Sequence, residues 1–110
     1  RFNLNHPMLE AAVELMASHL ADPLSPDQLS ALTGMSVRQL QRLFTAQVGS
    51  SMMAFYRDLR LMKTDELLQQ SSLSLVDIAV LTGFTDGAHL SRCFKDKYGV
   101  PPGRRRRNKE

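Results

Sequence analysis

Apolar residues along the chain recur at steps of three and four, whereas the alternation that marks a half-buried strand is nearly absent. Leu9, Val13, Met16 and Leu20 form one such stripe and predict a first helix over about 7–21. Serines suited to N-caps and glycines suited to helix ends divide the rest of the chain. They predict further helices over about 25–33, 36–48, 51–70, 74–83 and 86–98. The pattern therefore indicates an all-α fold.

Two segments of the chain share one pattern, which is a short capped helix, a glycine turn and a longer helix. The first part of the pattern recurs 49 positions later and the second part 50 positions later. The matching pairs are Ser25 with Ser74, Leu32 with Leu81, Thr33 with Thr82, Gly34 with Gly83, Leu40 with Leu90, Arg42 with Arg92, Phe44 with Phe94 and Gly49 with Gly99. This is the anatomy of a helix-turn-helix, whose second helix enters the major groove of DNA.

The longer helix of each copy is expected to turn its apolar side inward and its polar side outward. The expected cores are Leu29, Leu32, Leu40 and Phe44 in the first copy and Ile78, Phe84, Leu90 and Phe94 in the second. The outward side of the first copy carries Arg38, Gln41, Arg42 and Thr45. Arginine can bond to guanine and glutamine to adenine, each in a bidentate manner. An isolated helix with such a face would more often be merely solvated, but the repeat and the turn favour base reading.

The outward side of the second copy is poorer in base-reading groups. Its leading end holds Gly87, Ala88 and His89, and Ser91, Arg92 and Lys95 follow. Glycine and alanine offer at most a methyl contact. We therefore expect the first copy to supply most of the direct readout, with Arg92, His89 and contacts to phosphates coming from the second.

The formal net charge of +3 is unevenly distributed. Arg104, Arg105, Arg106 and Arg107 account for it, because residues 1–103 hold nine basic and ten acidic side chains. Within those residues the basic side chains cluster at 36–60 and 91–103, which contain the two longer helices of the repeat. The positive charge of the folded part thus coincides with the two expected reading helices.

The sequence resembles the DNA-binding domain of the AraC/XylS family of bacterial transcriptional regulators over about residues 7–102. The resemblance rests on GMSVRQLQRLF in the first copy, on LRL and the leucine pair in the long helix, and on LSLVDIAVLTGFTDGAHLSRCFKDKYGVPP. It implies seven helices, two helix-turn-helix units joined by a linker helix, and binding to an asymmetric promoter site. The base-reading positions that it implies are Arg38, Gln41, Arg42, Gly87, Ala88, Ser91 and Arg92. Thr64, where alanine is frequent in the family, and the small Gly87 and Ala88 depart from the family pattern.

The resemblance also suggests the layout of the chain. It predicts a first helix-turn-helix subdomain over 1–50, a linker helix over 51–70, a second subdomain over 71–103 and a disordered basic tail over 104–110. The recognition helices, about 36–48 and 86–98, would enter successive major grooves of double-stranded DNA. At about 1.5 Å per residue, the roughly 20 residues of the linker helix span about 30 Å, close to the 34 Å between such grooves.

Other residues are expected to contact phosphates or to play secondary roles: Ser36, Thr45, Thr85, His89, Lys95 and Arg105. The arginine run itself has three interpretations. It either grips phosphates at the edge of the site, or is a solvated disordered end, or belongs in part to an expression vector. The opening NHPMLEAAVELMASHL and the closing PPGRRRR resemble a branch of the family whose amino-terminal half is similar to class I glutamine amidotransferases. Members of that branch often regulate catabolism of arginine, betaine or carnitine, and effector binding and dimerisation would lie outside this chain.

Several classes of protein are not expected. Cys93 is the single cysteine, and the three histidines have no ligand spacing, so we expect neither a disulfide nor a metal or other cofactor. No nucleophile, acid–base pair or phosphate loop points to an enzyme. Without a membrane span or signal peptide, the default location is the cytoplasm, in association with the nucleoid. The alternative function is a helical interaction module that docks on RNA polymerase subunits through its acidic stretches, and RNA polymerase is also a candidate partner of a DNA-bound regulator.

Overall fold

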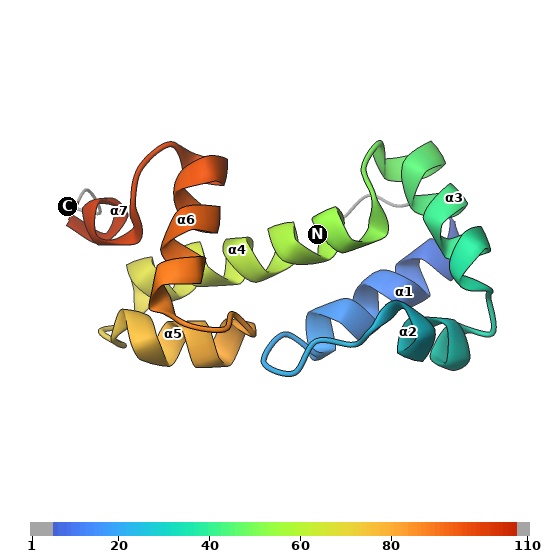
Figure 1. Ribbon diagram of the computed structural model, residues 1–110, viewed down its shortest axis with the longest axis horizontal. Coiled ribbons are helices and arrows are strands. Elements are labelled where there is room, and N and C mark those ends of the chain that lie inside the picture. The colour runs from blue at the N-terminus through green and yellow to red at the C-terminus, as the bar shows by residue number, and fades with distance from the viewer. Residues whose placement is uncertain (1–5, 108–110) are drawn as a thin grey trace. The chain divides into compact units, whose positions relative to one another are not determined.

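The computed structural model describes residues 6–107, and every regular element in that range is a helix (Figure 1). This confirms the predicted all-α fold. The seven helices are α1 (Pro7–Ser18), α2 (Pro26–Thr33), α3 (Val37–Val48), α4 (Met52–Gln70), α5 (Leu75–Thr82), α6 (Gly87–Tyr98) and α7 (Pro102–Arg107). No helix in the described range is long and apolar enough to cross a membrane.

Local capping determines where the short helices begin and end. Ser25 and Ser36 each accept a hydrogen bond from the backbone N–H three residues on, and the glutamine at that position bonds back to the serine N–H. Gly34 and Gly49 close these helices with φ of 77° and 83°, in the left-handed region that favours glycine. The N-cap serines and the closing glycines that the sequence predicts for these helices are therefore confirmed, and the glutamines complete a capping box at each start.

The chain divides into two compact units, and the division falls inside α4. One unit comprises the chain through His19 together with Pro23–Arg57, and the other comprises Leu20–Asp22 together with the chain from Asp58 onward. Each unit contains one helix-turn-helix, which is α2–α3 in the first and α5–α6 in the second. The start of α4, through Arg57, is therefore part of the first unit and the rest of α4 is part of the second, whereas the sequence predicts a separate linker over 51–70.

The first unit closes around the inward face of α3. Leu40 and Phe44 are fully buried, as is Leu29 of α2, and α1 adds Leu9 and Met16, both also fully buried. The Tyr56 hydroxyl then ties α4 to the loop after α1, because it donates to the His19 carbonyl and accepts from the Leu24 N–H. The predicted inward positions of α3 are thus confirmed.

The second unit repeats this plan with α4 as its base. Its core consists of Leu61, Leu68, Ile78, Ala79, Phe84, Leu90 and Phe94. Arg60 pins the end of α5 to α4, since its guanidinium donates to the carbonyls of Thr82 and Gly83 at 2.8 and 2.6 Å and lies 4.3 Å from the centroid of the Phe84 ring. Thr64 is fully buried, and its hydroxyl donates to the Arg60 carbonyl at 2.9 Å, so this departure from alanine leaves no unpaired donor.

Two details of the sequence prediction are wrong in these units. Leu32 is 57% exposed and its repeat counterpart Leu81 is 46% exposed, so neither is core. In α5 the buried positions are Ile78, Ala79 and Thr82, and at roughly 100° per residue position 81 falls on the flank of that stripe. The first helix also ends at Ser18 rather than at 21, where the His19 N–H bonds back to the Met16 carbonyl.

The burial pattern predicts a sharp contrast between two apolar substitutions in the first unit. Phe44→Ala removes a fully buried ring and is expected to lower the free energy of unfolding by about 3–5 kcal/mol. Leu32→Ala truncates an exposed side chain and should change it by no more than about 0.5 kcal/mol. Urea unfolding of both variants measures these changes. Equal losses would contradict the assignment of Leu32 to the surface.

Candidate nucleic-acid interface

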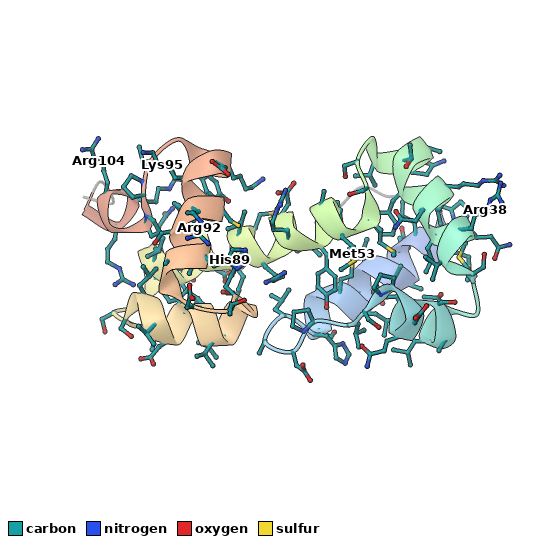
Figure 2. All side chains as sticks on the ribbon, in the orientation of Figure 1. Arg38, Met53, His89, Arg92, Lys95 and Arg104 are labelled. Atoms are coloured by element: carbon teal, nitrogen blue, oxygen red, sulfur yellow. The ribbon has the colours of Figure 1, made fainter. Side chains whose placement is uncertain are left out.

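The outward face of α3 carries a stripe of exposed polar side chains. Arg38, Arg42 and Thr45 follow one another at steps of four and three, and all three are exposed. Leu40 and Phe44 occupy the opposite side of the helix at 0% exposure. Figure 2 shows Arg38 extending from α3 away from the rest of its unit. No hydrogen bond or ion pair joins Arg38 or Arg42 to another described residue, so both guanidinium groups are available to a ligand.

Gln41 differs from these arginines because its side chain is already bonded inside the unit. Its Oε1 accepts from the backbone N–H of Met52, the first residue of α4, at 3.3 Å. A backbone N–H can only donate, so the amide oxygen must face it, and the NH₂ group is left for other partners. In this orientation Gln41 presents donors, which match acceptors such as guanine O6 and N7 or thymine O4. The bidentate pairing with adenine expected from the sequence needs the oxygen as well.

The counterpart of α3 in the second unit, α6, buries and exposes the equivalent positions, but different residue types stand on its outward face. Leu90 and Phe94 are fully buried, while Ala88, Arg92 and Lys95 are exposed. These three and the half-buried Ser91 are the repeat counterparts of Arg38, Arg42, Thr45 and Gln41. Within the described chain no partner engages Arg92 or Lys95. Figure 2 shows both of them on α6.

The residues at the N-terminal ends of α3 and α6 differ in how far hydrogen bonds or packing already engage their side chains. The exposed Ser36 uses its hydroxyl oxygen to cap α3, and Asp86 caps α6 by accepting from the His89 N–H at 2.8 Å. Thr85 is exposed beside that cap. A Cβ on Gly87 would meet Leu75 at 3.8 Å, an ordinary contact, so packing does not require glycine there.

His89 lies largely against its own unit. Its ring meets the Phe84 ring edge-on, with centroids 5.4 Å apart and planes at 71°. The buried Nδ1 atom has no hydrogen-bond partner among the described residues. This packing turns one edge of the ring into the protein, and it weakens the expectation that His89 contacts DNA.

The prediction of a disordered basic tail over 104–110 is wrong for residues 104–107. These residues lie in α7, which Pro102 opens in the first turn, where proline is favoured. Arg105 donates from Nε and Nη2 to the two carboxylate oxygens of Asp65 at 2.8 and 3.0 Å. Arg106 donates to the carbonyls of Leu68 and Ser71. Residues 108–110 of the predicted tail lie outside the described residues.

The guanidinium that the sequence assigns to a DNA phosphate, that of Arg105, has a partner inside the unit, and the phosphate contact itself stays a prediction. The Arg105 guanidinium is committed to Asp65 and lies 5.1 Å from the centroid of the Tyr98 ring, so it joins α7 to α4 and α6. Its hydrogen bonds hold the pKa of the Asp65 carboxyl below the usual value for aspartate. Burial raises the pKa of Tyr98. Sequence reasoning missed Asp65 because no local signal connects positions 40 residues apart.

The described residues contain no group of three or more histidine, cysteine or acidic side chains that could hold a metal ion. The half-buried Cys93 is a free thiol next to the second core. The polar groups exposed for a ligand include the cations and hydrogen-bonding groups of α3 in the first unit and, separately, those of α6 in the second.

Comparison with known proteins places this geometry in a family. A family model described as a helix-turn-helix domain matches residues 29–108. The transcriptional regulator GlxA of Rhizobium meliloti is 42% identical over 107 residues, which are 97% of this chain and 33% of GlxA. GbdR of Pseudomonas aeruginosa, also an HTH-type transcriptional regulator, is 37% identical over 98 residues, which are 89% of this chain and 27% of GbdR. The chain thus spans about a third or less of the curated relatives it matches.

Solved structures agree. A transcriptional regulator of Chromobacterium violaceum with an AraC-type DNA-binding domain is 37% identical, with a TM-score of 0.90 and coverage of 94% of this chain and 92% of that one. The DNA-binding domain of the global transcriptional factor AdpA, in complex with a target DNA, is 25% identical, with a TM-score of 0.86 and coverage of 94% and 93%.

The Asp65–Arg105 pair predicts how stability depends on pH. Because the pKa of Asp65 is lower in the folded than in the unfolded chain, the pair contributes stability at neutral pH and loses it as pH falls below about 4. Asp65→Asn should therefore melt below the wild-type chain at pH 7, and the gap should narrow at pH 3. Thermal melts at both pH values measure this. A gap that is unchanged between pH 7 and pH 3 would contradict the ion pair.

Proposed function

Because this chain belongs to the AraC family of helix-turn-helix transcriptional regulators, we propose that it reads specific double-stranded DNA with α3 and α6 in successive major grooves. The observation that carries the proposal is that α3 and α6 turn equivalent positions toward their cores and equivalent positions toward solvent. Each buries a leucine and a phenylalanine one turn apart and exposes an arginine without a described partner, Arg42 or Arg92, on its other side. DNA reading needs such groups held at a fixed angle.

The residues that we propose for base reading are those that the resemblance to the AraC/XylS family implies. They differ in how many hydrogen bonds they can make to base edges. In α3, Arg38 and Arg42 offer guanidinium forks for guanine, and Gln41 offers its NH₂ group to an acceptor atom. In α6, Arg92 is the counterpart of Arg42, and Ser91 adds a hydroxyl. Gly87 and Ala88 contribute close approach of the backbone and a methyl contact. The first unit therefore supplies more of the sequence discrimination than the second.

Around these groups we propose contacts to the phosphates from Ser36, Thr45, Thr85 and Lys95, which are all exposed. Such contacts fix register and supply affinity that depends on salt rather than on sequence. Arg105 is left out of this set because it is bonded to Asp65, and His89 because its ring packs against Phe84.

The length of α4 fits the proposal. Its 19 residues span about 28 Å, against about 34 Å between successive major grooves on one side of a duplex.

The wider role follows the family. We propose a regulator of the bacterial cytoplasm, associated with the nucleoid, that contacts RNA polymerase and that senses its effector and dimerises through parts outside this chain. Control of amino-acid or quaternary-amine catabolism rests on the resemblance to the amidotransferase-like branch. The described residues of this chain support binding rather than catalysis, since the polar groups on α3 and α6 match base edges and phosphates.

The direct test of sequence reading is selection of binding sites from a random duplex library, followed by titration of selected and random duplexes across salt concentrations. We expect tighter binding to the selected duplex at every salt concentration and a steep decline of both affinities with salt. Coincident curves would contradict sequence reading. Binding of RNA polymerase subunits that survives high salt and needs no DNA would favour an interaction module instead.

Arg42 provides a sharper version of this test. Arg42→Ala should weaken binding to the selected duplex by about 1–3 kcal/mol and relax the preference at one base pair. Arg42→Lys keeps the charge and loses the fork, so it should retain affinity for random duplex and still lose that preference. If the lysine variant keeps the full preference, Arg42 contributes charge rather than base reading.

Gln41 allows the orientation of its amide to be tested. Gln41→Glu keeps an acceptor for the Met52 N–H and has no donor, so thermal stability should change little. The base preference at one position of the selected site should shift away from guanine or thymine, and repeating the site selection with the variant measures this. A wild-type preference for adenine at that position would contradict the donor-only orientation.

A further inference from the structure

The arginine run at 104–107 is divided between two kinds of role, as far as the structure describes its side chains. Arg105 and Arg106 are bound within their own unit, through Asp65 and through the carbonyls of Leu68 and Ser71. Both of these arginines are half-buried. Arg104 is exposed, and nothing in the described part of the chain accepts a hydrogen bond from it or pairs with it.

These contacts hold α7 against the recognition helix of its unit. The Arg105 guanidinium lies over the ring of Tyr98, the last residue of α6, and Pro102 at the start of α7 is buried. α6 and α7 pack together. Figure 2 shows Arg104 projecting outward from α7. Its backbone is thus fixed to the end of α6 while its side chain is free.

The cations of α6 likewise include one that is paired within the unit and others that have no described partner. Lys97 pairs with Asp58 at 3.7 Å and lies 5.5 Å from the centroid of the Tyr98 ring. Arg92 and Lys95 are exposed, and no described residue pairs with them. The acidic Asp96 is the exposed carboxylate among them on α6. Among the described side chains of these two helices, the cations available to an anion are therefore Arg92, Lys95 and Arg104, two on α6 and one on the helix packed against it.

We propose that Arg104 binds a DNA phosphate beside the groove that α6 enters, and that Arg105 is the positioning residue that holds Arg104 there. The proposal rests on the proposed function, since it needs α6 to lie on DNA. It adds a phosphate contact from outside both helix-turn-helix units. Arg104 would then contribute affinity without sequence preference, because a phosphate contact carries no base information.

The test uses the 110-residue chain and a random-sequence duplex, with affinities measured by fluorescence anisotropy between 50 and 200 mM salt. Arg104→Ala should reduce the slope of log affinity against log salt by about 0.9, the value for one lost phosphate contact. Its melting temperature should equal that of the wild-type chain. Arg104→Lys should restore the slope, and Arg104→Gln serves as a second uncharged variant.

Arg105→Ala and Lys95→Ala make the outcomes distinguishable, because Lys95 is the phosphate-contacting residue proposed on α6 itself. Arg105→Ala should lower the melting temperature and also reduce the slope, because α7 loses its tie to Asp65. If Arg104→Ala keeps the wild-type slope while Lys95→Ala reduces it, the phosphate role of Arg104 is refuted and the role of α6 stands. If neither variant reduces the slope, α6 does not lie on DNA and the proposed function of the second unit fails as well.

Discussion

A buried leucine followed one turn later by a buried phenylalanine fixes the rotation of each recognition helix, and the outer surface of the domain depends on this. Leu40 with Phe44 and Leu90 with Phe94 all have 0% exposure. A 12-residue helix held by two side chains on one stripe cannot turn about its axis without opening its core. Arg42 and Arg92 therefore point outward because the residues on the other side of each helix are packed, and the base reading that we propose depends on this core packing.

The same scaffold carries two different surfaces. Positions that hold Arg38, Gln41 and Thr45 in α3 hold Ala88, Ser91 and Lys95 in α6, while Arg42 and Arg92 correspond. The first helix is richer in hydrogen-bonding groups for bases, and the second adds Lys95 and, on our proposal, Arg104 as charges for the backbone. On our proposal, the duplicated fold thus divides specificity and affinity between its copies, because burial constrains the inward positions and leaves the outward ones free to diverge.

The features that the sequence predicts well are local. The caps at Ser25 and Ser36 need a partner only three residues away, and the repeat identifies the packed positions of α3 and α6. Contacts between distant residues were not predictable in this way. The fate of Arg105 depends on Asp65, the amide of Gln41 on the N–H of Met52, and the exposure of Leu32 on how a short helix lies on its neighbours. The candidate base-reading positions themselves stay predictions.

The central claim is that one chain uses two recognition helices on one DNA site. Methylation protection of guanine N7 on a selected duplex tests it most directly, because N7 lies in the major groove. The account predicts two clusters of protected guanines about 10 base pairs apart, and Arg92→Ala should weaken protection in one of them. A single protected cluster, unchanged by Arg92→Ala, would contradict it.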